Sequence, residues 1–563
     1  MRVRSAPRRR VRRFVVVASA ALLAALVAPT TATAAGPAYD LTQLDGCGQG
    51  GYTATRTAGG WTVDDVAFGY SYDQSFMTEG NWRTVTSTDT VYQLHGYGLM
   101  WLPGLLREAR DSGDTSVIEP LVVSLAASLA WRPDNRVVTD PVWSEGVTMR
   151  RENSLNCLYT VTHDPRLVPL ITALVTANLD PARYYGPPRT KPHNHGLLAN
   201  LSLLDTAALL GRSDWRDAAI ARMAAAIDGS FTPVGLSIEQ SLAYHVSNVL
   251  VWSDAAARVR ALGHEALATH IDTVLVRARS ATEYARNPAG VPVNFGDQEA
   301  LPAPVVAQRR LVMIDPYVGV LTGRWSWKAP DDFYAVRFGG PTRMHGHQDR
   351  GSVVWWATGR PVLVDPGTAD YTAGDASAWS RSNIAHNVAR IASRTFVPAA
   401  VISRTSSSQT SSLASVLLTG APYGLTQTRS ITVDPVRNSL RLVDTGVSGR
   451  MNQVLQLDPR WTLQSINSTR TMATFTDSTG GWMTVSTRAR IASVVTGADG
   501  LAGGWTFRYP PSEKFAAPRV TIAGLSRTTV TQVRVYGPAQ TPWASVPSAP
   551  AAARAQAEST PLD

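Results

Sequence analysis

The residue composition of this chain changes once, from a helical pattern to a strand pattern. Up to about residue 286, Ala and Leu recur at helical spacing and predict helices at 117–131, 197–210, 215–227 and 271–284. From about residue 333, short alternating runs rich in Val, Thr and Ser predict strands, among them 352–356, 430–433, 440–443 and 483–487. Helices followed by many short strands predict an α+β protein, an all-helical array and then an antiparallel β-sandwich.

The first 35 residues have the pattern of a secretory signal peptide. Seven arginines precede the apolar run 15–27, and Ala32-Thr33-Ala34 offers small residues suited to signal peptidase. We therefore expect a secreted protein. The general secretory pathway is favoured over the twin-arginine pathway, because Arg12-Arg13 is embedded in a run of arginines. The apolar run is too short to span a membrane comfortably, so we expect no membrane anchor in the mature form.

The mature chain is expected to carry little net charge. The formal charge of the whole chain is +10, and loss of the seven signal arginines would leave +3. Outside the signal there is no strongly basic stripe, which argues against a nucleic-acid partner. Cys47 and Cys157 could form one disulfide in an oxidising compartment, but the sequence leaves their pairing open.

Three histidines gather early in the strand-rich half. His345 and His347 are two positions apart, so on an extended segment they would face the same side. Asp365 follows the short predicted strand 361–364, and His386 comes 21 residues later. Three of these side chains could close on one metal ion.

A second group of reactive side chains lies in the helical half. Asn194 and His195 immediately precede a predicted helix, and Glu239, Tyr244 and His245 follow about fifty residues later. Each has a purely structural explanation, since a histidine at a helix start can serve as a cap and a tyrosine can belong to the core.

Together these motifs resemble the heparinase II/III-type polysaccharide lyases, a family that includes alginate lyases. The resemblance is carried by Asn194-His195-Gly196, Glu239-Gln240-Ser241-x-x-Tyr244-His245, Met344-His345-Gly346-His347-x-Asp349, Val364-Asp365-Pro366-Gly367-Thr368 and Ala385-His386-Asn387. It implies an incomplete α/α toroid over residues 36–325, an antiparallel β-sandwich over 326–546 and an Ala/Pro-rich tail over 547–563. The implied reaction is β-elimination on an anionic, uronic-acid-containing polysaccharide.

The resemblance also assigns roles to single residues. Asn194 and His345 would neutralise the substrate carboxylate, and Tyr244 would act as base and acid. His195 would either favour the Tyr244 phenolate or serve as the base for the opposite uronate epimer. The remaining set, His347, Asp365 and His386, would bind a structural Zn²⁺ with Asp349 beside it, and the alternative is a hydrogen-bonded cluster without metal.

Two other classes of function remain open from the sequence. A glycoside hydrolase on a similar toroid would need two carboxylates flanking the bond, for which Asp297 and Glu239 are candidates. A non-catalytic polysaccharide-binding protein could use the same scaffold, because a fold does not fix a function. The small charge of +3 favours a less sulfated uronate polymer as the ligand.

Overall fold

The structure is a computed structural model of the whole chain. It describes residues 39–537 except for the segments 42–46, 48–50, 59, 67, 79–88, 132–140, 182–183, 185–192, 299–309, 329–331, 372–373 and 510–511. Both the expected signal peptide, 1–35, and the expected tail, 547–563, lie outside the described residues.

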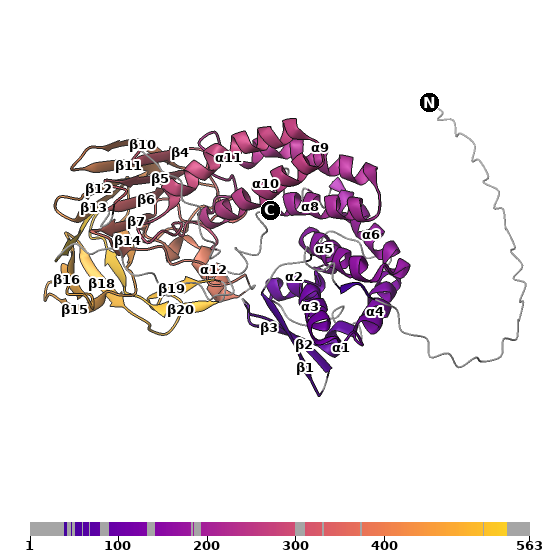
Figure 1. Cartoon of the computed structure of the whole chain (residues 1–563). Coiled ribbons are helices and arrows are strands. Elements are labelled where there is room, and N and C mark those ends of the chain that lie inside the picture. Colours follow the sequence, from indigo (N-terminus) through magenta and orange to yellow (C-terminus); the bar gives the residue numbers. More distant parts are fainter. Residues whose placement is uncertain are drawn as a thin grey trace, which may run out of the picture. The chain divides into compact units, whose positions relative to one another are not determined.

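Helices fill most of the N-terminal half (Figure 1). They are α1 (Gln74–Thr78), α2 (Thr90–Tyr97), α3 (Leu102–Ser112), α4 (Ile118–Trp131), α5 (Glu145–Thr162), α6 (Val168–Leu179), α8 (Asn194–Leu209), α9 (Ser213–Ser230), α10 (Leu242–Ala261) and α11 (Glu265–Ala285). Each of the four predicted helices is present as α4, α8, α9 or α11. Leu and Ala side chains of α8 to α11 pack with Trp215 and Trp252 in one buried core, and this burial stabilises the array.

The helical half also contains a small sheet that the sequence analysis did not predict. Strands β1 (Tyr52–Thr57), β2 (Gly60–Asp65) and β3 (Tyr70–Asp73) pair antiparallel in the order β1-β2-β3. On β2, buried and partly buried residues alternate, and Trp61 and Val63 are among the buried ones. The expectation of purely helical structure before residue 286 is therefore corrected for this segment.

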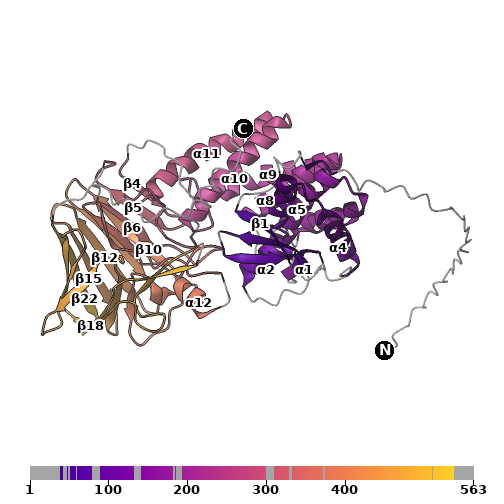
Figure 2. The same ribbon diagram turned by 60° about the horizontal axis from the view of Figure 1, so that its bottom comes forward.

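The C-terminal half is built from antiparallel strands, as predicted (Figure 2). A five-stranded sheet contains β4 (Val312–Asp315), β5 (Val320–Arg324), β6 (Phe333–Arg337), β7 (Val353–Ala357) and β8 (Arg360–Leu363) in that order. An eight-stranded sheet has the order β10-β11-β12-β13-β22-β17-β16-β15, with bounds Ile402–Gln409, Ala414–Gly420, Gln427–Asp434, Ser439–Gly446, Thr528–Tyr536, Trp482–Thr487, Met472–Thr476 and Thr462–Ile466. The smaller sheets are β18-β21-β14-β9 (Arg490–Val495, Arg519–Ala523, Met451–Gln456, Ala389–Ile391) and β19-β20 (Trp505–Arg508, Glu513–Ala516). The short helix α12 (Asp375–Arg381) lies between β8 and β9 in sequence.

The five-stranded sheet is buried on both faces. Every residue of β5, β6, β7 and β8 is buried. Trp355 and Val353 point into the sandwich core with residues of the eight-stranded sheet. Their neighbours Trp356 and Val354 point the opposite way and pack with Leu242 of α10. This sheet is therefore the layer through which helices and sandwich contact each other.

Strands β4 and β5 precede residue 326, where the predicted sandwich begins, and the domain limits themselves stay predictions. Among the described residues, no helix combines the length and apolar character needed to cross a membrane. The thiols of Cys47 and Cys157 are buried and hydrogen-bonded to each other, so the fold brings together two cysteines whose proximity the sequence left open.

Candidate active site

Asn194 and His195 occupy the first positions of α8. The preceding residue, His193, caps the helix, and its Nδ1 accepts a hydrogen bond from the His195 amide at 3.3 Å. The Asn194 amide donates to Glu239 Oε1 at 2.9 Å, and the Asn194 side-chain oxygen lies 3.0 Å from His193 Nδ1. These bonds fix the helix start and hold the Asn194 side chain in place.

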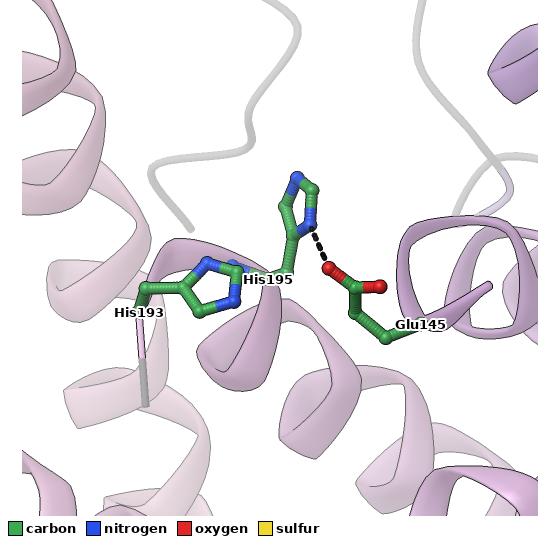
Figure 3. Close-up of side chains that lie close together, drawn as sticks. All are labelled: Glu145, His193 and His195. Atoms are coloured by element: carbon green, nitrogen blue, oxygen red, sulfur yellow. Dashed lines mark hydrogen bonds and ion pairs between the residues drawn. The ribbon is translucent and has the colours of Figure 1, made fainter. Parts of the chain in front are cut away.

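His195 is paired with a glutamate from α5 (Figure 3). Glu145 points toward its ring, with Oε1 3.4 Å from Nδ1. Burial lowers the pKa of His195 to about 4, although Glu145 acts in the raising direction, and the nearby Arg150 also disfavours the charged ring. At neutral pH this imidazole is therefore uncharged and able to accept a proton.

Glu145, His193 and His195 also offer donor atoms within 4.8 Å of one another, as a metal site would. The positive end of the α8 dipole and the Arg150 charge both oppose a cation at this position. We therefore interpret the group as a carboxylate–histidine pair beside a capping histidine.

Tyr244 lies in the first turn of α10. Its amide donates to the N-cap hydroxyl of Ser241 at 3.0 Å. Its ring stacks on that of His345, with centroids 3.5 Å apart and an interplanar angle of 9°. Its hydroxyl is 3.0 Å from the hydroxyl of Tyr371, a residue that the sequence analysis did not single out.

His345 and His347 do not lie on a strand, contrary to the expectation. They lie in the turn between β6 and β7, where Met344 has a φ of +36°. The half-buried His345 ring contacts two acidic residues, with Nδ1 3.2 Å from Asp297 Oδ2 and Nε2 3.5 Å from Glu239 Oε2. Glu239 thus contacts both the Asn194 amide and the His345 ring.

His347, Asp365 and His386 are brought together as expected for a metal site. All three are buried, and they offer ligand atoms within 4.8 Å of one another. His386 Nδ1 lies 2.8 Å from Asp365 Oδ2, and His347 Nε2 lies 3.0 Å from Asp297 Oδ1. The second nitrogens, His347 Nδ1 and His386 Nε2, are buried without a hydrogen-bond partner among the described residues. Two buried imidazole nitrogens beside a carboxylate fit a zinc ion better than they fit a closed hydrogen-bond network.

Asp349, expected beside the metal, is fully buried. One of its oxygens lies 3.3 Å from Arg337 Nε, so it forms an ion pair with β6. This contact accounts for its burial without a ligand role.

The sequence analysis missed part of the surroundings of these residues. Glu145 and Tyr371 were not considered, and Glu239 and Asp297 were weighed mainly as a hydrolase pair. Burial opposes ionisation of Asp297, but hydrogen bonds from His345 and His347 hold its pKa well below its usual range. A carboxyl group that stays ionised cannot serve as the general acid that hydrolysis requires.

Comparison with known proteins places this geometry in a family. Residues 323–550 match the model of the heparinase II/III-like C-terminal domain. The chain is similar to a solved heparinase III, with a TM-score of 0.65 and 16% identity over 82% of this chain and 80% of that one. It is also similar to a heparan sulfate lyase of Pedobacter heparinus, with a TM-score of 0.56 and 15% identity over 82% and 79% of the two chains. No curated protein sequence matches the chain significantly. Residues 323–550 thus belong to the heparinase II/III-like C-terminal domain family, and the chain has the heparinase III fold, a helical toroid followed by an antiparallel β-sandwich.

Proposed function

We propose that this protein is a polysaccharide lyase that cleaves a uronic-acid-containing polysaccharide by β-elimination. The supporting observation is the convergence of three chain segments on one site. Tyr244 stacks on His345, and Glu239 contacts both His345 and the Asn194 amide. The structural neighbours are themselves polysaccharide lyases by their titles.

The reaction explains why these side chains are needed together. Removing the C5 proton, α to the carboxylate, adds a second negative charge beside the first. The side-chain amide of Asn194 and the imidazole of His345 supply donors for that developing charge, and such donors lower the barrier more than they stabilise bound substrate. Tyr244 then takes the C5 proton and delivers a proton to the departing O4.

A phenol with an ordinary pKa of about 10 is a weak base at neutral pH. Its phenolate needs nearby donors, and the Tyr371 hydroxyl at 3.0 Å is placed to act as one. The imidazole of His345, stacked on the Tyr244 ring, would favour the phenolate further when protonated.

His195 is proposed as the base for the uronate epimer whose C5 proton lies on the opposite face. Its neutral state at pH 7 supports this role, because its pKa is lowered to about 4. Glu145 would hold the Nδ1 proton and leave Nε2 as the accepting atom.

Zn²⁺ is proposed as a structural ion held by His347, Asp365 and His386. The elimination needs no metal-bound hydroxide, so the ion would serve to hold together the β6–β7 turn, the end of β8 and the segment before β9. Secretion and a preference for a weakly sulfated glycosaminoglycan or other uronate polymer are proposed on the expected signal peptide and the small net charge.

The test is a panel of uronate polysaccharides, including heparan sulfate, hyaluronan and alginate, assayed for ultraviolet absorbance. A lyase product carries a double bond conjugated to its carboxylate, so absorbance should rise on at least one polymer. Reducing ends released without absorbance would support a hydrolase instead. Binding without either product would support the non-catalytic alternative.

A further inference from the structure

One carboxylate lies between the proposed catalytic histidine and the proposed zinc site. Asp297 Oδ2 is 3.2 Å from His345 Nδ1, and Asp297 Oδ1 is 3.0 Å from His347 Nε2. A third donor, Arg381 Nε, lies 3.0 Å from the same Oδ1. The side chain is only 4% exposed, so these contacts are made away from bulk water.

The main chain of Asp297 is fixed as closely as its side chain. Its amide donates to the His345 carbonyl at 2.7 Å, and its carbonyl accepts from the Ser241 hydroxyl at 2.6 Å. The preceding Gly296 has a φ of +80°, and a Cβ there would lie 2.5 Å from the His345 carbonyl oxygen. Any side chain at 296 would therefore push the start of α10 away from the β6–β7 turn.

The two carboxylate oxygens have different consequences for the two rings. On His345, the bond fixes a proton on Nδ1 and orients Nε2 toward Glu239 and the substrate position. On His347, the bond fixes a proton on Nε2 and leaves Nδ1, which has no partner in the described part of the chain, as a ligand atom. Metal-bound histidines characteristically donate their other N–H to such a carboxylate.

We propose that Asp297 is a positioning residue that couples the zinc site to the catalytic site, holding His347 for the metal and His345 for the substrate with one carboxylate. This inference rests on the proposed lyase function. Loss of Asp297 should therefore weaken zinc binding and slow turnover together, while substrate affinity changes little.

The test is the isosteric change Asp297→Asn in the full chain. An amide can accept from one histidine but presents N–H groups to the other, so one of the two bonds must break. Zinc affinity, measured by competition with a chromophoric chelator, should fall by about 10–100-fold. We expect kcat on the best polymer to fall at least tenfold while KM stays within threefold.

A matched control is Asp477→Asn. This buried aspartate pairs with Arg360 at 3.0 Å, outside the proposed site. Its loss should lower the melting temperature but leave zinc affinity and kcat of the folded protein unchanged. Equal losses in both variants would overturn the proposal, because they would show a general effect of removing a buried charge.

The outcomes separate the two proposals. If the wild type gives no unsaturated product from any polymer, the lyase function fails. If the wild type is active and Asp297→Asn loses only zinc affinity or only kcat, the coupling fails. If Asp297→Asn does not fold, zinc is withdrawn from the wild type while circular dichroism monitors folding. Folded, zinc-free protein with an unchanged kcat would overturn the coupling.

Discussion

The imidazole of His345 lies parallel to the phenol ring of Tyr244, with ring centroids 3.5 Å apart. Tyr244 comes from the start of α10 and His345 from the turn between β6 and β7, so the proposed site contains side chains from both halves of the chain. This contact makes the sandwich a direct contributor to the proposed chemistry.

The change Tyr244→Phe should reduce turnover by at least about a hundredfold, because it removes the group that transfers the proton. The stacking surface on His345 is retained, so polysaccharide affinity should change less than threefold in affinity electrophoresis. The control is Tyr334→Phe, which removes a hydroxyl that donates to Gln409 in the sandwich. That variant should keep wild-type turnover, and an active Tyr244→Phe enzyme would refute the assignment of Tyr244.

Changes at the two neighbouring histidines should separate catalysis from metal binding. His345→Ala should lose activity and keep its zinc, because Asp297 still holds His347. His347→Ala should lose both and melt several degrees lower, since a bound ion stabilises the folded state. Elemental analysis, thermal melting and the absorbance assay measure these effects. Zinc absent from the purified wild type after supplementation would contradict the metal assignment.

Glu145 is expected to act through His195. Glu145→Ala removes the group that faces Nδ1, so turnover of the epimer served by His195 should fall about tenfold, a modest share of the usual acid–base contribution. Glu145→Gln retains an oxygen that can accept the same hydrogen bond and should recover most of the loss. Equal defects in the two variants would show that the negative charge, rather than ring orientation, matters.

Stability should fall in acid because of His245. Its Nδ1 accepts from the Ser237 amide, and its Nε2 lies 3.0 Å from the Ala278 carbonyl oxygen, an arrangement that suits a neutral ring. Burial lowers the pKa of His245 to about 4 in the folded protein, while an unfolded chain would protonate near pH 6.5. The unfolded state therefore binds more protons between these values, and this residue can cost up to about 3 kcal/mol of stability as pH falls from 6.5 to 4.

Denaturant melts between pH 4 and pH 7 measure this dependence. His245→Gln removes the titrating ring and should flatten the acid slope even if it lowers stability at pH 7. The exposed His264 offers a control, because His264→Gln should keep the wild-type slope. An unchanged slope in His245→Gln would assign the acid effect to other groups.

Local patterns in the sequence predicted the main elements of the fold. Helical spacing and strand alternation are properties of neighbouring residues, and they predicted α4, α8, α9, α11 and the antiparallel sandwich. The sheet of β1 to β3 was missed although residues 52–73 are rich in Tyr, Thr and Val, residue types that favour strands. The strand expected around His345 is a turn, because Gly346 packs so closely against Gln240 that a Cβ would lie 2.7 Å from its side-chain oxygen.

The contacts that organise the site were beyond a local reading. Asp297 reaches His345 across 48 residues, and Tyr244 reaches Tyr371 across 127. The resemblance to a known family supplied Asn194, His195, Tyr244 and His345, but it did not supply Glu145 or Asp297. Such partners are set by tertiary packing between segments whose own sequences carry no sign of the contact.

The burial of the five-stranded sheet on both faces limits how this polypeptide can be divided. A fragment that began at β4 would leave Phe333, Trp356 and their apolar neighbours without the helices that cover them. Such a fragment would expose a continuous apolar surface and aggregate. Recombinant production, directed evolution and domain shuffling of this protein must therefore treat helices and sandwich as one inseparable folding unit.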